Sequence, residues 1–313
     1  MERFVRTILI IGGLLLLGLA LGFALGLPWL TRFWPNPVDT PLSYLFVASM
    51  QAAIAVAMLW IGITGGLHMI AAGSLNLAVM FGGMSVSLMR DETLLGEQTF
   101  IYVIGFALFA LFNVVLIIWA RQFVEPDPYP MPDILRWAYG IFVISLASVG
   151  ALLISQTQEI MPWPLSPLTS ALIGWMFFGD AFYFLYALIY PRWTNSAAQL
   201  WSFLAYDLVL IWPFLTRFAD IITKRRLLND DTLIVDGKLV TDPTLTTELK
   251  SITDPELIAL AQRFATERHN VEWMFNSLTV YLVVLLFSFT LAIHYLFLHP
   301  DTGLWVRIRS RRE

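Results

Sequence analysis

Two aspartates, Asp180 and Asp207, lie inside apolar stretches that are long enough to cross a bilayer. The turn YPRWTNSA separates the two stretches, and each aspartate lies about ten residues from it. At a rise of about 1.5 Å per residue, both carboxyl groups are expected about 15 Å from the same membrane face, near the middle of the hydrocarbon. An aspartate at that depth costs about 2.5–3.5 kcal/mol on insertion scales, so two at matching depth on adjacent helices require an explanation.

The surroundings of these aspartates lead to two hypotheses. No Lys or Arg lies near the centre of any apolar stretch, so no ion pair neutralises them, and the loss of water favours their protonated form. As neutral acids they would hydrogen-bond helices together in a structural or accessory membrane component, which is the role we expect. The alternative is a proton or cation site in a permease for a small solute, because a buried carboxyl that exchanges its proton serves many carriers. The candidate partners of the aspartates are Tyr183, Tyr186, Tyr206 and Asn113.

The histidines and the missing motifs bear on cofactors and catalysis. His68 and His294 fall near the same membrane face if the chain has eight spans, which is a weak indication of a haem or metal site. The sequence contains no Cys, which excludes disulfides, thiolate metal ligands, thiol nucleophiles and CxxCH haem attachment. It also contains no GxSxG, HExxH or glycine-rich phosphate loop. We therefore expect no cofactor and lean against an enzyme.

An intramembrane aspartyl protease would need two carboxyls that share a proton. Tyr206-Asp207 matches the YD signature of that class, but Phe178-Gly179-Asp180 lacks the first glycine of GxGD. The two signatures also occur in the reverse order along the chain. This reading is therefore a minor alternative.

The composition determines the fold class. Of the 313 residues, 58% are hydrophobic and 13% are charged, about half the charged fraction of a soluble domain. We predict an all-α integral membrane protein, multi-pass in a cell membrane. The first apolar run is longer than a typical signal core, so we expect an uncleaved span. Windows of about 19 residues predict eight spans, at residues 8–30, 44–67, 71–89, 100–120, 135–155, 169–189, 197–217 and 274–298.

The segment 71–89 is the weakest of these spans, because it is short and rich in Gly and Ser, and a re-entrant segment would reduce the count to seven. Eight spans place the N-terminus and the basic tail RIRSRR on one side of the membrane, which we expect to be cytoplasmic.

Residues 223–272 form a polar insertion between residues 1–222, with seven spans, and residues 273–313, with the last span and a basic tail. TLIVDGKLV predicts a β-hairpin whose turn is Asp236-Gly237. Asp254 and Pro255 then suit the start of an amphipathic helix. We expect a small hairpin-plus-helix module that rests on the membrane surface or a neighbouring loop, as a structural cap rather than a partner-docking site.

Glycines recur at four-residue spacing in the first two spans, at Gly18, Gly22 and Gly26 and again at Gly62 and Gly66. Such stripes let helix backbones approach closely in lipid. We expect them to pack helices within the chain, with a homo-oligomer or a membrane-protein partner as the alternative. No basic surface suggests nucleic acid.

The stretch PWPLSPLTSALIGW, followed by PRW and FLAYDLVL, resembles a group of uncharacterised bacterial polytopic membrane proteins. The last span, SLTVYLVVLLFSFTLAIHYLFLHP, is also similar to that group, and the insertion at 223–272 departs from its shorter form. The resemblance covers about half the chain and implies a helical protein of the bacterial inner membrane. It implies no activity and no binding residues.

Overall fold

The computed structural model describes residues 1–35, 40–90, 97–123, 129–229, 232–235, 238–241, 255–300 and 302. Within this part of the chain, eight helical segments are long and apolar enough to span a membrane, as the hydropathy pattern predicts. Their bounds are α1 (Glu2–Ala24), α3 (Pro41–Thr64), η1 with α4 (Leu67–Met69 and Ile70–Arg90), α5 (Glu97–Ala120), α6 (Asp133–Ile154), α7 (Pro167–Ile189), α8 (Trp193–Asn229) and α9 (Pro255–Ile293). A short helix α2 (Pro28–Thr31) follows α1, and a π-helical turn η3 (His294–Leu298) ends α9.

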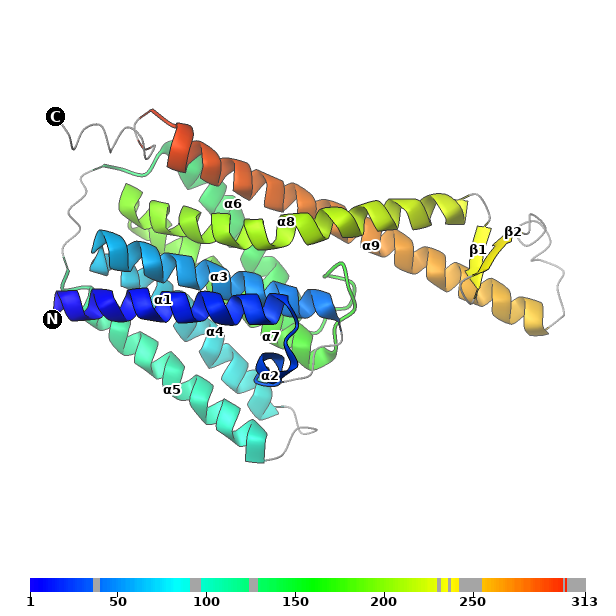
Figure 1. Ribbon diagram of the computed structural model, residues 1–313, viewed down its shortest axis with the longest axis horizontal. Helices are drawn as coiled ribbons and strands as arrows, with labels where there is room; N and C mark the ends of the chain where they lie inside the picture. Colours follow the sequence, from blue (N-terminus) through cyan, green and yellow to red (C-terminus); the bar gives the residue numbers. More distant parts are fainter. Residues whose placement is uncertain are drawn as a thin grey trace.

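The weakest predicted span is a complete helix. The 3-10 turn η1 leads directly into α4, which continues to Arg90, so a re-entrant segment is excluded. Gly65 ends α3 with a φ of +79°, a left-handed conformation that glycine adopts without strain. The chain thus reverses between α3 and α4 within a few residues. For this reason the apolar runs of these two helices are almost continuous in the sequence. Figure 1 shows that Met1 and the end of α9 lie at the same end of the bundle, as an even number of spans requires.

The helices do not pack in chain order. The main contacts join α1 with α3, α3 with α8, α8 with α9, α4 with both α5 and α7, and α6 with α7 (Figure 1). By contrast, α7 and α8 approach each other little along their backbones. The two helices joined by the short turn are therefore neighbours through side chains, such as Gln199, which donates to the Tyr183 carbonyl oxygen, rather than through close backbone packing. Aromatic rings fill the space between them, with Phe184 and Phe203 only 4.4 Å apart.

Glycine allows close backbone contact at Gly62, as predicted, but not along the predicted stripe of the first span. Only Gly22 of the first-span stripe packs tightly, and it packs against Leu30 of α2, whereas a Cβ atom on Gly18 or Gly26 would meet nothing within 4 Å. The contact between α1 and α3 uses Gly62, where a Cβ would lie 2.7 Å from Ile10 Cγ1. The stripe at 18, 22 and 26 is thus not a helix–helix seam within the chain, and its role in a homo-oligomer stays a prediction.

Much of the polar insertion consists of the extended ends of α8 and α9. β1 (Thr232–Val235) pairs antiparallel with β2 (Lys238–Thr241), so the hairpin forms in the predicted register. The predicted amphipathic helix, however, is the first part of α9 and runs without interruption into the last span. Its expected cap Asp254 and the hairpin turn at 236–237 lie outside the described residues.

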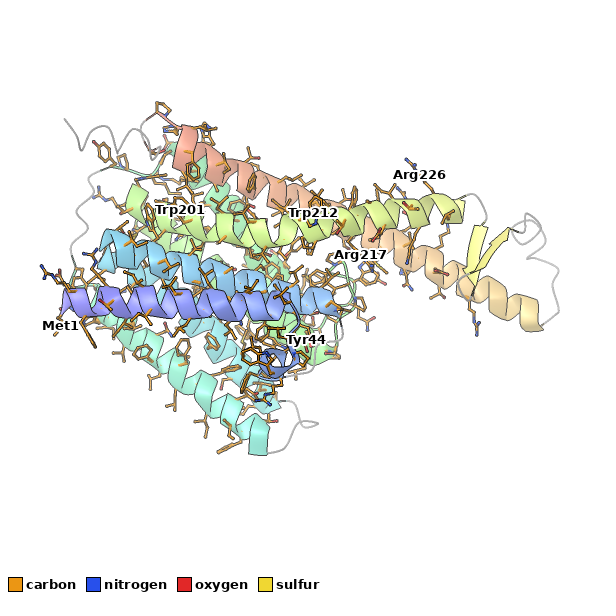
Figure 2. The ribbon with its side chains drawn as sticks, in the orientation of Figure 1. Met1, Tyr44, Trp201, Trp212, Arg217 and Arg226 are labelled. Carbon is orange, nitrogen blue, oxygen red and sulfur yellow. The ribbon has the colours of Figure 1, made fainter. Side chains whose placement is uncertain are left out.

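We call the paired extensions of α8 and α9 together with the hairpin the stalk. Figure 1 shows the hairpin far from the bundle, whereas the helix that follows it contacts the loop between α6 and α7 through His269 and Glu159. At the base of the stalk, Arg225 Nε donates to Glu272 Oε1 over 2.8 Å, and its guanidinium lies 4.2 Å from the centre of the Phe275 ring. Figure 2 shows Arg226 out on the stalk and Met1 at the opposite end of the molecule.

Candidate functional site

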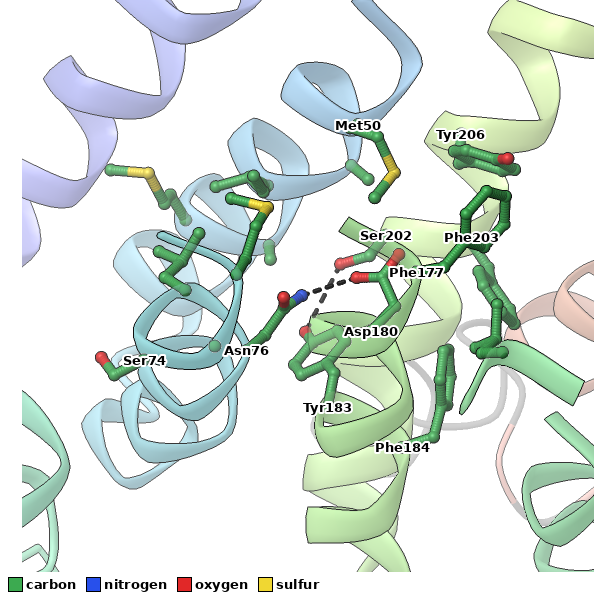
Figure 3. Close-up of a pocket in the computed structure, with 18 of the residues that line it drawn as sticks. Met50, Ser74, Asn76, Phe177, Asp180, Tyr183, Phe184, Ser202, Phe203 and Tyr206 are labelled. Carbon is green, nitrogen blue, oxygen red and sulfur yellow. Dashed lines mark hydrogen bonds between the residues drawn. The ribbon is translucent and has the colours of Figure 1, made fainter. Parts of the chain in front are cut away.

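Asp180 lies on α7 and is held by an amide from another span. Asn76 on α4 donates from Nδ2 to Asp180 Oδ1 over 2.6 Å (Figure 3). The contact is possible because Gly179 lies where α4 and α7 meet, and a Cβ there would be 2.9 Å from the Asn76 carbonyl oxygen. Asn76 is only 6% exposed, and its Oδ1 has no hydrogen-bond partner. The pair therefore presents an unpaired acceptor inside the membrane.

Asp207 lies on α8 and is fully buried, with 0% exposure. Ser288 on α9 places its Oγ 2.9 Å from Asp207 Oδ1 and 2.8 Å from Oδ2, and also 3.0 Å from the Leu285 carbonyl oxygen. A serine hydroxyl has a single proton to donate. If the carboxyl is neutral, it donates to Ser288, and Ser288 donates to Leu285, so every group is used. The arrangement suits a neutral hydrogen-bonding acid that ties α8 to α9.

The two aspartates are separate groups. Asp180 lies nine residues before Ile189, where α7 ends, and Asp207 lies fourteen residues after Trp193, where α8 begins. At about 1.5 Å per residue this places them at depths that differ by roughly 7 Å. No hydrogen bond joins them among the described residues, and each binds a helix other than the one that carries its counterpart. The helix bounds thus place the two aspartates at different depths rather than at the matching depth expected, and the two carboxyls do not bond each other.

A cavity of about 1030 Å³ opens beside Asp180. Residues of all eight spans line it, and most of them are apolar. Its polar lining includes Asp180, Asn76 and Asn113, whereas Asp207 does not line it, although its partner Ser288 does. Figure 3 shows Asp180 and Asn76 facing each other across the gap between α7 and α4, with aromatic rings of α7 and α8 around them.

The cavity reaches the surface of the bundle that faces lipid. Its lining includes Ile8, Phe112, Val115 and Val280, which are each at least half exposed. On helices that cross a membrane, such exposed apolar side chains contact lipid chains. Part of the cavity lining therefore belongs to the surface of the bundle that faces lipid.

The loop between α6 and α7 bounds the cavity on the stalk side. Glu159, Ile160 and Met161 line it there. Two contacts with α9 hold the loop: His269 Nε2 lies 2.9 Å from Glu159 Oε1, and Trp273 Nε1 donates to the Glu159 carbonyl oxygen over 2.8 Å. His269 lies within α9. These contacts fix one end of the cavity to the helix that carries Ser288.

The predicted helpers of the aspartates bind other groups. The Tyr183 hydroxyl lies 3.4 Å from Ser202 Oγ, and the Tyr206 hydroxyl bonds that of Tyr281. Asn113 donates to the Phe109 carbonyl oxygen of its own helix. Tyr183, Tyr206 and Asn113 nevertheless line the cavity beside Asp180. The structure thus gathers them around one aspartate but not as its direct partners.

The two histidines do not form a joint site in the described structure. His68 is buried, with Nε2 3.3 Å from Thr194 Oγ1. His294 lies in η3, with its ring edge-on to Tyr295 and to His299. Neither lines the cavity, and the described residues contain no group of three or more potential ligands that could hold a metal. The haem or metal hypothesis gains no support from this geometry.

The sequence reasoning missed the two direct partners. Asn76 was the one strongly polar side chain in the segment 71–89, and the doubt over that span hid its significance. Ser288 gave no signal, since serine is common in membrane helices and can bond its own backbone, as it does here to Leu285. Tyr281 was also missed, because a single tyrosine within a predicted span does not indicate its partner.

Comparison with family models, with curated proteins and with solved structures finds no match to this chain. The resemblance to bacterial polytopic proteins therefore stays a prediction, and the function has to be argued from the geometry.

The role of Asp207 can be tested by substitution. Asp207→Asn keeps a side chain that can donate a hydrogen bond to Ser288 or accept one from it. The free energy of unfolding of this variant should therefore differ from that of the unmodified protein by less than about 0.5 kcal/mol. Asp207→Leu removes the tie between α8 and α9 and should cost about 0.5–2 kcal/mol, the range of interhelical hydrogen bonds in membranes. Reversible unfolding of the purified protein in mixed micelles measures both. Equal losses in the two variants would show that the hydrogen bond does not stabilise the fold.

Proposed function

We propose that this multi-pass membrane protein is a carrier-type binding protein that takes small lipophilic molecules from the bilayer into the cavity beside Asp180. The observation that supports it is a cavity of about 1030 Å³ that opens toward lipid and encloses a polar pair near mid-depth. Sites for drug-sized ligands have roughly 300–1,000 Å³ and combine apolar walls with a few polar groups. The volume and the lining of this cavity both fit that description.

The apolar walls also argue against a path for a strongly hydrated solute. A polar solute in the membrane needs water or polar groups along its whole route. Here the polar groups are a minority of the lining, and Asp180 with Asn76 is the hydrogen-bonded pair between two spans among them. A molecule with one polar group and an apolar body matches this distribution, which refines the small-solute permease suggested by the sequence.

A structural or accessory role is the second candidate, and the hydrogen bonds of the aspartates favour it. Asp180 and Asp207 each bond a residue from another span, which is what interhelical ties do. For Asp207 this role accounts for every contact. For Asp180 it leaves unexplained why the carboxyl faces a large cavity, so we propose that the two aspartates have different roles.

Binding of a neutral aromatic dye tests this proposal. N-phenyl-1-naphthylamine should bind saturably to the protein in phosphatidylcholine nanodiscs, as fluorescence above that of empty nanodiscs. Gly73→Trp should weaken binding by about tenfold or more, the equivalent of about 1.4 kcal/mol. Gly73 lines the cavity, and a Cβ atom added there meets nothing within 4 Å, so the indole is expected to extend into the cavity.

Gly105→Trp is the matched control. A Cβ on Gly105 of α5 also meets nothing within 4 Å, but Gly105 does not line the cavity. This variant should bind the dye as tightly as the unmodified protein. If both tryptophan variants and the unmodified chain bind alike, or if no saturable binding occurs, the cavity is not a binding site and the structural role remains.

A further inference from the structure

We infer that the molecule bound in the cavity is a lipophilic cation, and that it displaces a proton from Asp180. This inference rests on the proposed function and narrows it to one class of ligand. It follows from the charges that line the cavity, from the unpaired acceptor of Asn76 and from the aromatic rings around the carboxyl group.

The charge of the lining selects a cation. Among the described residues that line the cavity, none is a Lys, Arg or His, and the side chains that can carry charge are the carboxyls of Asp180 and Glu159. Glu159 lies at the stalk end and is engaged with His269. Near mid-depth, Asp180 is therefore the single group that can hold a net charge against a ligand, and that charge is negative.

The polar groups next to Asp180 are acceptors as well. Asn76 uses its amide N–H to bind Asp180 Oδ1, which leaves its own Oδ1 buried and without a partner. A buried acceptor of this kind costs free energy until a donor or a positive charge approaches it. An ammonium or a similar cation would satisfy both the carboxylate and the amide oxygen, whereas an anion would be repelled by both.

Aromatic rings form the rest of the wall. Phe177, Tyr206 and Tyr281 line the cavity, and the Phe177 and Tyr281 rings lie 6.5 Å apart. Figure 3 shows Phe177, Phe184 and Phe203 around Asp180. The faces of aromatic rings attract cations, most strongly where water is excluded. Apolar substituents on the cation would occupy the remaining volume.

Cation binding requires that Asp180 lose its proton. No Lys, Arg or His among the described lining residues compensates a carboxylate at Asp180, so without a bound cation the carboxyl holds a proton. When the cation binds, the O–H bond of the carboxyl breaks, the proton passes to water, and the carboxylate balances the charge of the ligand. The lipophilic cation and the proton therefore compete for the carboxyl of Asp180, and binding of one releases the other.

The other titratable groups near the cavity have partners of their own. The Tyr183 hydroxyl is paired with Ser202, and the Tyr206 hydroxyl with Tyr281. The carboxyl of Asp207 is bonded to Ser288, and that of Glu159 to His269. Met1, which carries the amino terminus, lines the far end of the cavity.

Two probes of nearly the same shape and opposite charge test the inference: tetraphenylphosphonium and tetraphenylborate. Calorimetry with the full chain in phosphatidylcholine nanodiscs, with empty nanodiscs subtracted, should show saturable binding of the cation and at least about tenfold weaker binding of the anion. Asp180→Asn should weaken binding of the cation by about tenfold or more, and Asp207→Asn should leave it unchanged. Binding should weaken as the pH falls, because protons compete for the carboxyl.

Titrations in two buffers of different ionisation enthalpy count the protons, and about one proton should leave per cation bound in the range where Asp180 is protonated. Equal binding of the two probes, tight cation binding by Asp180→Asn, or no proton release would overturn the inference. Saturable dye binding without cation binding would overturn it and leave the proposed function intact. If neither the dye nor either probe binds, both fail.

Discussion

Gly174→Ala is expected to lower the free energy of unfolding by about 1–3 kcal/mol, as an overpacked interface does. Gly174 lies on α7 where it meets α6. A Cβ atom there would be 2.7 Å from the Ile154 amide nitrogen and 2.9 Å from the Gly150 carbonyl oxygen. Both neighbours are backbone atoms, so no side chain can rotate away, and the two helices have to separate. Unfolding of the purified protein in mixed micelles measures the loss.

Gly140→Ala on α6 is the matched control for this substitution. A Cβ on Gly140 meets nothing within 4 Å, so the variant adds the same methyl group without a clash. Because alanine favours a helix over glycine by up to about 1 kcal/mol, this variant should be as stable as the unmodified protein or more stable. Equal stability of Gly174→Ala and Gly140→Ala would contradict the close approach of α6 and α7.

Asn76→Leu is expected to cost about 1–3 kcal/mol, because it leaves the carboxyl of Asp180 without its hydrogen-bond partner. Asp180→Leu removes the same bond from the other side. The double variant should lose less than the sum of the two single losses, with a coupling of about 0.5–3 kcal/mol. Unfolding of all four proteins under the same conditions gives this coupling directly.

The double variant of Asn76→Leu and Asp207→Leu is the control for this coupling measurement. Asn76 bonds Asp180, and Asp207 bonds Ser288, so the described hydrogen bonds give these two positions no shared partner. Their losses should add within about 0.5 kcal/mol. If the losses of Asn76→Leu and Asp180→Leu also added, the two side chains would not stabilise one another. The hydrogen bond between Asn76 and Asp180 would then be contradicted.

The spans could be predicted from the sequence for a physical reason. A helix in lipid has to satisfy its backbone internally and present an apolar surface over its whole length, so hydropathy alone locates it. The eight spans of the described residues were located in this way. The hairpin was predictable because its turn and strands are local signals.

The pairing of side chains across the bundle was not predictable in the same way. A short turn between α7 and α8 fixes only their ends, and large aromatic residues then hold the rest of the two helices apart. Asp180 thus meets Asn76 from α4, more than one hundred residues away in the sequence. Hydropathy identified which side chains are costly in lipid but not which helix satisfies each of them.

The uninterrupted course of α8 and α9 has a mechanical consequence. Their 37 and 39 residues correspond to about 55 and 58 Å, nearly twice the thickness of the hydrocarbon. The same two rods carry the hairpin at one end and, within the membrane, Tyr206 bonded to Tyr281 and Asp207 bonded to Ser288. The stalk is therefore joined through two continuous helices, one of which contains Pro213, to side chains that line the cavity.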